Sequence, residues 1–155
     1  MNNQVVEVAI AILYRDDKFL FQLRDDIPNI VYPGHWGLFG GHLDPGETPD
    51  IAVARELLEE IGYSLPSISK FGCYNDVKVI RHVYHAPLTV ELDRLFLSEG
   101  WDMDLLTPEQ IRQGSRYSTK ADRILPLVPA AQRILLDFID TGVAVTNQYK
   151  DLPDR

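Results

Sequence analysis

The sequence predicts a single domain of the α/β or α+β class, and three observations support this prediction. The chain has 155 residues, which fits the roughly 100–200 residues of one domain. Hydrophobic residues make up 45% and charged residues 25%, as in a folded protein rather than a disordered one. Stretches rich in β-formers alternate with stretches that carry helix start and stop residues. We expect one domain over residues 1–145 and a polar C-terminal tail over residues 146–155.

The first part of the chain predicts a β-hairpin followed by a long structured loop. Val5–Tyr14 and Lys18–Leu23 are rich in β-formers, and Asp16-Asp17 between them suits a tight turn. Proline and glycine are concentrated in residues 25–49, which indicates a loop region of the kind that often carries a functional site.

The next segment predicts a helix over about Pro49–Ile61. Thr48 suits the N-cap, Pro49 suits the first turn, and Gly62 suits the position just after the helix. One apolar stripe is expected to face the core, and three glutamates are expected on the opposite side. The stripe is Ile51, Ala54, Leu58 and Ile61, and the glutamates are Glu56, Glu59 and Glu60.

The remainder of the chain predicts further strands and two more helices. Residues 68–97 are β-rich. Thr107–Gln113 suits a short helix with Thr107 as its N-cap and Pro108 in its first turn. Pro126–Ile139 suits a closing amphipathic helix that ends before Gly142.

Charge, cysteine content and hydropathy exclude several functions. Fifteen basic and twenty-three acidic side chains give a formal net charge of −8, so duplex nucleic acid, which needs a basic face, is not an expected partner. Cys73 is the only cysteine, which excludes an intrachain disulfide and favours a reduced cytoplasm. No apolar stretch reaches the roughly 20 residues that cross a bilayer, so no membrane partner is expected.

The loop before the acidic helix indicates that a metal ion supplies positive charge. The glycine spacing from Gly41 to Gly46 resembles a phosphate-binding P-loop, but Glu47 stands where that loop requires lysine. A loop that lacks its own cation and leads into three carboxylates suggests a divalent cation shared with substrate phosphates. The alternative is a solvated acidic face.

The segment 41–63 resembles the Nudix box, G-x5-E-x7-R-E-U-x-E-E-x-G-U. All fixed positions match, and only the last aliphatic position departs, where Tyr63 stands. The departure puts no catalytic role in doubt. The matching residues are Gly41, Glu47, Arg55, Glu56, Leu57, Glu59, Glu60 and Gly62.

The resemblance implies a fold, an activity and a cofactor. Nudix hydrolases share an α/β/α sandwich with a mixed β-sheet, and they cleave a nucleoside diphosphate linked to another moiety with Mg²⁺ or Mn²⁺. Glu59 and Glu60 would be the principal metal ligands. Glu56 would be a further ligand or the base that accepts a proton from water, and the Gly41 carbonyl would complete the coordination.

Four further residues receive roles in this interpretation. Arg55 and Glu47 would form a pair that orients the helix and the loop. Glu99 is the preferred acid outside the box, as an extra ligand or base, because it is expected to follow a strand and precede a loop. Asp102 is the second choice. The alternative for both acids is a solvated loop residue.

Substrate contacts are assigned to residues upstream of the helix. Trp36 would stack on a base, Arg24 would contact phosphate or sugar, and Gly40 and Gly41 would line the site. The alternatives are packing for Trp36 and a solvated strand end for Arg24.

The leading substrate class is a nucleoside triphosphate, cleaved by a MutT-like pyrophosphohydrolase, with an oxidised purine nucleotide as one candidate. A nucleotide sugar or a dinucleotide is second. A Nudix-fold module that senses a nucleotide without cleaving it is the non-enzymatic alternative, and isopentenyl diphosphate isomerase is a third. The partner is thus a small nucleotide, and the sequence leaves a homodimer open.

Overall fold

The computed structural model describes residues 4–142, which form two compact units. Unit 1 consists of residues 4–13 and 38–99, and unit 2 of residues 14–37 and 100–142. Strand β1 (Val6–Arg15) belongs to both, because the chain passes from one unit to the other at Tyr14. The predicted boundary at residue 145 and the tail 146–155 lie outside the described residues. No helix in the described part is long and apolar enough to span a bilayer.

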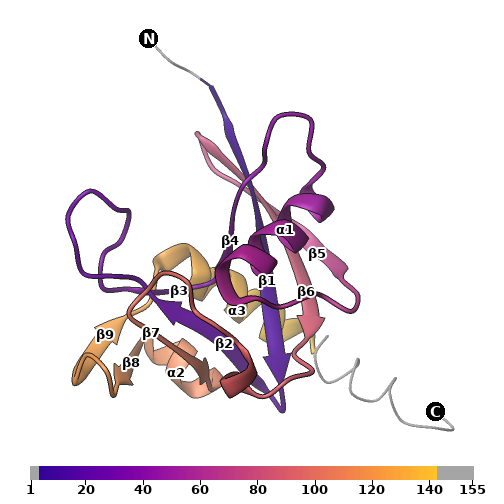
Figure 1. Cartoon of the computed structure of the whole chain (residues 1–155). Helices are drawn as coiled ribbons and strands as arrows, with labels where there is room; N and C mark the ends of the chain where they lie inside the picture. Colours follow the sequence, from indigo (N-terminus) through magenta and orange to yellow (C-terminus); the bar gives the residue numbers. More distant parts are fainter. Residues whose placement is uncertain (1–3, 143–155) are drawn as a thin grey trace, which may run out of the picture. The chain divides into compact units, whose positions relative to one another are not determined.

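Unit 1 contains a mixed sheet in which β1 lies between β4 and β6. β1 and β4 are antiparallel, with Ala9 opposite Gly41 and Ile10 opposite Gly40. β5 and β6 form an antiparallel pair, whereas the arrows of β1 and β6 point the same way (Figure 1). The other strands of unit 1 are β4 (Phe39–His42), β5 (Ser69–Asn75) and β6 (Val79–Pro87).

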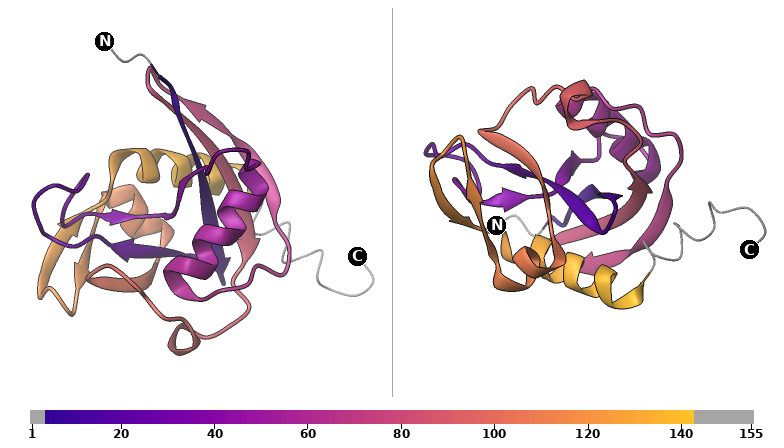
Figure 2. Two further views of the ribbon diagram at one scale, coloured as in Figure 1. Left: turned by 45° about the horizontal axis from the view of Figure 1, so that its top comes forward. Right: turned by 90° about the horizontal axis from the view of Figure 1, so that it is seen from below.

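Helix α1 (Pro49–Ile61) has the predicted bounds and lies against β4 and β6 (Figure 2). Thr48 occupies the N-cap position but its side chain makes no capping hydrogen bond, and Pro49 occupies the first turn. Gly62 has a φ of 66°, a left-handed conformation that glycine adopts without steric cost. Its N–H donates to the Leu58 carbonyl, and the N–H of Tyr63 donates to the Leu57 carbonyl, which closes the end of the helix.

The prediction of which face of α1 is buried is wrong for Ile51, Ala54 and Leu58, which are exposed, and right for Ile61, which is buried. Ile51 and Leu58 are 57% and 55% exposed, while the buried positions form the neighbouring stripe. This stripe begins with small residues, which allow the helix to approach the glycine-bearing strand β4 closely. Its members are Ala52, Val53, Leu57 and Ile61.

The β-rich prediction for residues 68–97 holds only as far as Pro87, where β6 ends. Beyond it lies a single 3₁₀ turn, η1 (Leu92–Arg94). The N–H groups of Phe96 and Ser98 donate to the carbonyls of Ile61 and Glu60 at the end of α1, so they do not extend a strand. The departure from the box at Tyr63 is structural, because this buried side chain donates its hydroxyl to the Pro87 carbonyl.

Unit 2 is built around β2 (Lys18–Leu23), which forms the predicted hairpin with the end of β1. Asp16 and Asp17 have φ values of 51° and 66°, as expected for the two central residues of a tight hairpin turn. β2 also pairs in antiparallel fashion with β3 (Trp36–Gly37) and β7 (Asp102–Leu106).

Two helices and a second hairpin complete unit 2. α2 (Pro108–Gln113) begins after Thr107 with a full capping box, as predicted. α3 (Pro129–Thr141) begins three residues later than predicted, because the Leu127 and Val128 N–H groups donate to the carbonyls of Gly114 and Trp36. The hairpin strands are β8 (Ser115–Ser118) and β9 (Arg123–Pro126). The predicted α/β class with a mixed sheet is confirmed.

Candidate active site

Arg55 lies at the centre of a charged network on α1 in unit 1. Its Nε and Nη2 atoms donate to the two carboxylate oxygens of Glu47 at 2.6 and 2.9 Å. Nη2 also donates to the His42 carbonyl oxygen at 3.1 Å. A bidentate arginine–carboxylate pair fixes both distance and orientation, so the loop before α1 is tied to the helix. The predicted pairing of Arg55 with Glu47 is confirmed.

The opposite edge of the same guanidinium faces two further carboxylates of α1. Nη1 donates to Glu59 Oε1 at 2.8 Å and to Glu56 Oε2 at 3.4 Å. Asp44 Oδ2, from the loop, lies 3.3 Å from Nε. One positive charge therefore lies within ion-pair distance of four acidic side chains, and the network retains an excess of negative charge.

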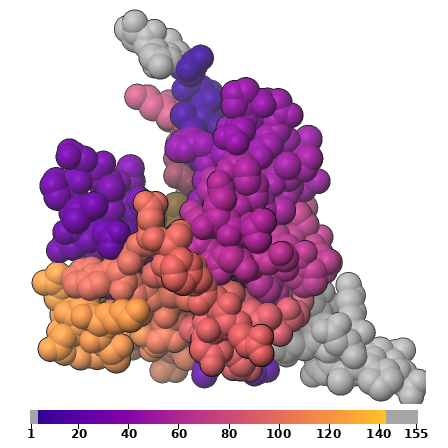
Figure 3. Space-filling view, viewed as in Figure 1, coloured from indigo at the N-terminus to yellow at the C-terminus, as the bar shows by residue number. Residues whose placement is uncertain are grey.

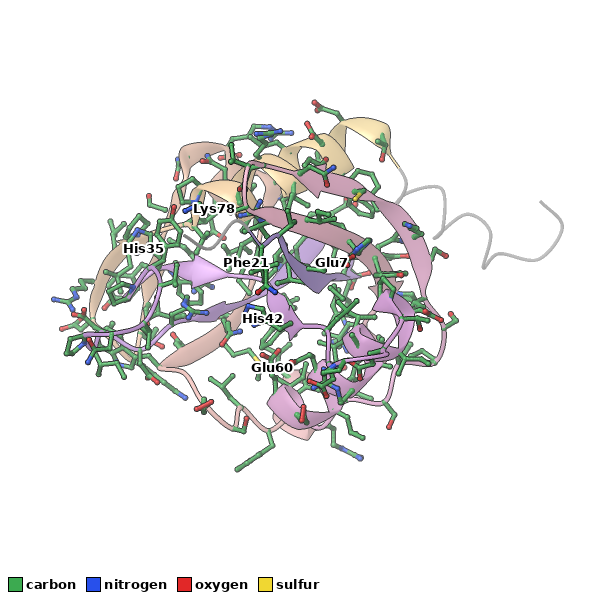
Figure 4. All side chains as sticks on the ribbon, turned by 90° about the horizontal axis from the view of Figure 1, so that it is seen from above. Glu7, Phe21, His35, His42, Glu60 and Lys78 are labelled. Atoms are coloured by element: carbon green, nitrogen blue, oxygen red, sulfur yellow. The ribbon has the colours of Figure 1, made fainter. Side chains whose placement is uncertain are left out.

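Two glycines of β4 bring the strand backbone against the carboxylates of α1. A Cβ atom at Gly41 would overlap the Glu56 carboxylate, and one at Gly40 would overlap the carbonyl oxygen of Ala9 on β1. Gly40 N donates to Glu60 Oε1 at 3.0 Å; Glu60 is labelled on α1 in Figure 4. Gly41 is therefore required for the close contact of β4 with the acidic helix, and Gly40 for its close contact with β1.

The environments of Glu47 and Glu56 shift their pKa values in opposite directions. Hydrogen bonds from Arg55 and from the Asp44 N–H lower the pKa of Glu47 to about 2. Burial raises the pKa of Glu56, and the nearby charge of Glu59 adds to this rise, while Arg55 opposes it. Glu56 is thus a carboxylate whose negative charge is only partly compensated.

The donor set fits a divalent cation in its chemistry. It offers only oxygen atoms, which hard cations prefer, and the loop and α1 are exposed on one face of unit 1 (Figure 3). Among the described residues, however, no three His, Cys, Asp or Glu side chains already form a group that could hold a metal ion. The guanidinium of Arg55 stands between the carboxylates.

Trp36 and Arg24, the predicted substrate contacts, belong to unit 2. Trp36 is fully buried, its Nε1 donates to the Arg116 carbonyl, and the Arg116 guanidinium lies over its ring. Packing accounts for this side chain, and its contact with a base stays a prediction. Arg24 Nε donates to the Val31 carbonyl at 2.7 Å and thereby holds its own loop.

The two acids proposed from outside the box lie in different settings. Glu99 is exposed in unit 1, one residue after Ser98, whose N–H and hydroxyl both donate to the Glu60 carbonyl. It does not directly follow a strand, since β6 ends at Pro87, and its role stays a prediction. Asp102 is buried in unit 2 and accepts a hydrogen bond from Ser118 Oγ.

Two members of the network were missed by sequence reasoning. Asp44 adds a carboxylate at 3.3 Å from Arg55, and its presence inside the glycine-rich loop was the available signal. The His42 carbonyl could not be found from the sequence, because a main-chain acceptor has no residue-type signature.

Comparison with known proteins shows similarity to one family. The model of the NUDIX domain family matches residues 4–127. A Bacillus subtilis (strain 168) protein named "Putative 8-oxo-dGTP diphosphatase" is 33% identical over 142 residues, which cover 92% of this chain and 85% of that protein. The nucleoside triphosphatase NudI of Enterobacter sp. (strain 638) is 39% identical over 51 residues, 32% of this chain and 36% of that protein.

Solved structures show the same fold. A MutT Nudix hydrolase from Burkholderia pseudomallei superposes with a TM-score of 0.64 at 25% identity and covers 86% of this chain and 97% of that one. The E. coli ORF135 protein gives a TM-score of 0.65 at 25% identity over 91% and 93% of the two chains. With every fixed position of the box matched and its arginine bound to the loop glutamate, the chain belongs to the Nudix hydrolase family.

Proposed function

We propose that this Nudix hydrolase cleaves a nucleoside triphosphate to a nucleoside monophosphate and pyrophosphate, with Mg²⁺ or Mn²⁺ as cofactor. The observation that carries the proposal is the convergence of Glu56, Glu59 and Glu60 of α1 beside Gly40 and Gly41 of β4. An oxidised purine nucleotide is the leading substrate. Support comes from the Bacillus subtilis relative, whose name refers to 8-oxo-dGTP and whose similarity extends over most of both chains.

Glu59, Glu60 and Glu56 would hold the cation, with the Gly41 carbonyl as a further ligand. The bound cation would offset negative charge that develops on the leaving phosphate and lower the pKa of a water molecule. Nudix hydrolases generally use divalent metals, and the all-oxygen donor set agrees with that use.

The remaining residues either hold the loop and helix in position or accept a proton. Arg55 and Glu47 keep the loop in register with α1 through their bidentate contact. Glu56 is suited to accept the proton of the attacking water, since burial raises its pKa toward the working pH. We assign Glu99 as a candidate extra ligand or base at the C-terminal end of α1. The reduced cytoplasm expected from the single cysteine is the proposed compartment.

A nucleotide panel tests the proposal. Purified protein with MgCl₂ is incubated with 8-oxo-dGTP, dGTP and ATP, and with ADP-ribose, a nucleotide sugar and a dinucleoside polyphosphate. We expect a nucleoside monophosphate from the triphosphates, and free phosphate only when inorganic pyrophosphatase is added. Turnover confined to the linked nucleotides would instead support a nucleotide-sugar or dinucleotide pyrophosphatase. Tight binding of a nucleotide without turnover would support a sensing module.

A further inference from the structure

The guanidinium of Arg55 has two edges with different surroundings. Nε and Nη2 are held by both oxygens of Glu47 at 2.6 and 2.9 Å and by the His42 carbonyl. Nη1 is shared by Glu59 at 2.8 Å and Glu56 at 3.4 Å. One edge thus has a bidentate anchor, and the other has single contacts with two proposed metal ligands.

The acids that contact the two edges also differ in their exposure to solvent. The Glu47 side chain is 12% exposed, whereas that of Glu59 is 56% exposed. An exposed ion pair at i,i+4 contributes little to stability, so Glu59 can leave Nη1 at little cost. The bidentate contact with Glu47 is more restrictive, because both carboxylate oxygens are engaged.

We propose that Arg55 is a built-in counter-ion whose Nη1 edge occupies the cation position between Glu56 and Glu59 when no metal is bound. On metal binding, these two carboxylates exchange Nη1 for the divalent cation, while Glu47 keeps its hold on Nε and Nη2. This inference rests on the metal site proposed above. It explains why the carboxylates converge and yet no ready group of three metal-binding side chains is found among the described residues.

The proposal predicts opposite effects for two changes that both break the Arg55–Glu47 pair. Arg55→Gln removes the competing cation, so the dissociation constant for Mn²⁺ should fall about tenfold, as expected for one unit charge near a divalent ion. Glu47→Gln frees the guanidinium to bind Glu56 and Glu59 more tightly, so the dissociation constant should rise. If Arg55 served only as a brace between loop and helix, both changes would weaken Mn²⁺ binding alike.

Free Mn²⁺ measured by electron paramagnetic resonance, without nucleotide and at fixed ionic strength, tests these signs. The proteins are wild type, both single variants and the Glu47→Gln/Arg55→Gln double variant, in which the dissociation constant should fall below that of Glu47→Gln. Arg81→Gln is the matched control, because it removes an arginine of unit 1 that pairs with Asp76 at 3.0 Å. Its effect should stay below about twofold.

An unchanged or raised dissociation constant in Arg55→Gln overturns the proposal, while wild-type Mn²⁺ binding shows that the metal site itself stands. Absence of Mn²⁺ binding in the wild type overturns both. If Arg55→Gln does not fold, nitrogen NMR of the wild-type Arg55 side chain replaces it. Mg²⁺ should speed rotation of the Nη groups and leave the Nε–H resonance in place, and unchanged Nη resonances at saturating Mg²⁺ would contradict the exchange.

Discussion

Each unit contains a cluster of charged and polar side chains, and the two clusters differ in how their charge is balanced. In unit 1, one arginine serves four acids, and part of the cluster is exposed. In unit 2, Arg116 pairs with Asp104 at 2.9 Å, and the buried Asp102 accepts a 2.7 Å hydrogen bond from Ser118. Each acid there has its own donor.

The difference indicates what each cluster does. A buried polar group costs free energy unless it has a partner. Both acids of the unit 2 cluster have donors within the protein, while the buried Nε of Arg116 has no hydrogen-bond partner among the described residues. The unit 1 cluster keeps an excess of negative charge beside a glycine strand, which no arrangement of its own side chains removes. Excess charge of this kind suits a site that takes up a cation.

Removal of one proposed ligand from the unit 1 cluster should have the largest effect. Glu59→Gln should lower kcat at saturating Mg²⁺ by at least about a hundredfold, because loss of a metal contact removes several kcal/mol of transition-state stabilisation. Its free energy of unfolding without metal should change by less than about 0.5 kcal/mol, since the pair with Arg55 is exposed. Turnover near the wild-type rate would contradict the ligand assignment.

A side chain introduced on β4 should disturb the same cluster through steric overlap alone. In Gly41→Ala the new Cβ would overlap the Glu56 carboxylate, and we expect kcat to fall by about tenfold or more as the carboxylate moves. Gly72→Ala is the matched control, since its Cβ would meet no atom within 4 Å. Equal kinetics for the two variants would show that the contact of Gly41 with Glu56 has no role.

The bounds of α1, the residues at its two cap positions and the Arg55–Glu47 pair could be predicted from the sequence, because local residue types and fixed spacings determine them. The buried face of α1 could not, because two apolar stripes lie side by side on the helix and only packing on β4 selects one. The contacts of Arg55 with Glu56 and Glu59 also depend on the side-chain arrangement. Trp36 shows the same limit, since its ring is covered by Arg116 from a strand eighty positions later in the chain.

A substitution in the unit 2 cluster should lower the stability of the protein rather than its turnover. Asp102→Ala leaves the fully buried hydroxyl of Ser118 without its acceptor, so the free energy of unfolding should fall by about 1–3 kcal/mol. Urea unfolding measures this, with the exposed Asp93→Ala as a control expected within about 0.5 kcal/mol of wild type. A large loss of kcat in a stably folded Asp102→Ala protein would instead support Asp102 as the acid outside the box.

The smallest expected effect is the loss of stability at low pH that follows from protonation of Glu47. Glu47 has a folded-state pKa of about 2, below its ordinary value of 4.5, so the folded protein binds fewer protons there than the unfolded chain. The contribution of Glu47 to stability is therefore fully present above pH 4.5 and is lost as the pH falls toward 2. Carboxyl carbon NMR should show Glu47 ionised at pH 3.5, and a titration midpoint near 4.5 would contradict the Arg55 contact.

Uptake of a divalent cation by unit 1 is most directly tested by urea unfolding with and without Mg²⁺. At one hundred times the measured dissociation constant, Mg²⁺ should stabilise the wild type by about 2.7 kcal/mol, and NaCl of equal ionic strength should not. Glu59→Gln should lose most of this gain. A wild-type unfolding curve that neither Mg²⁺ nor Mn²⁺ shifts, with or without nucleotide, would contradict the account.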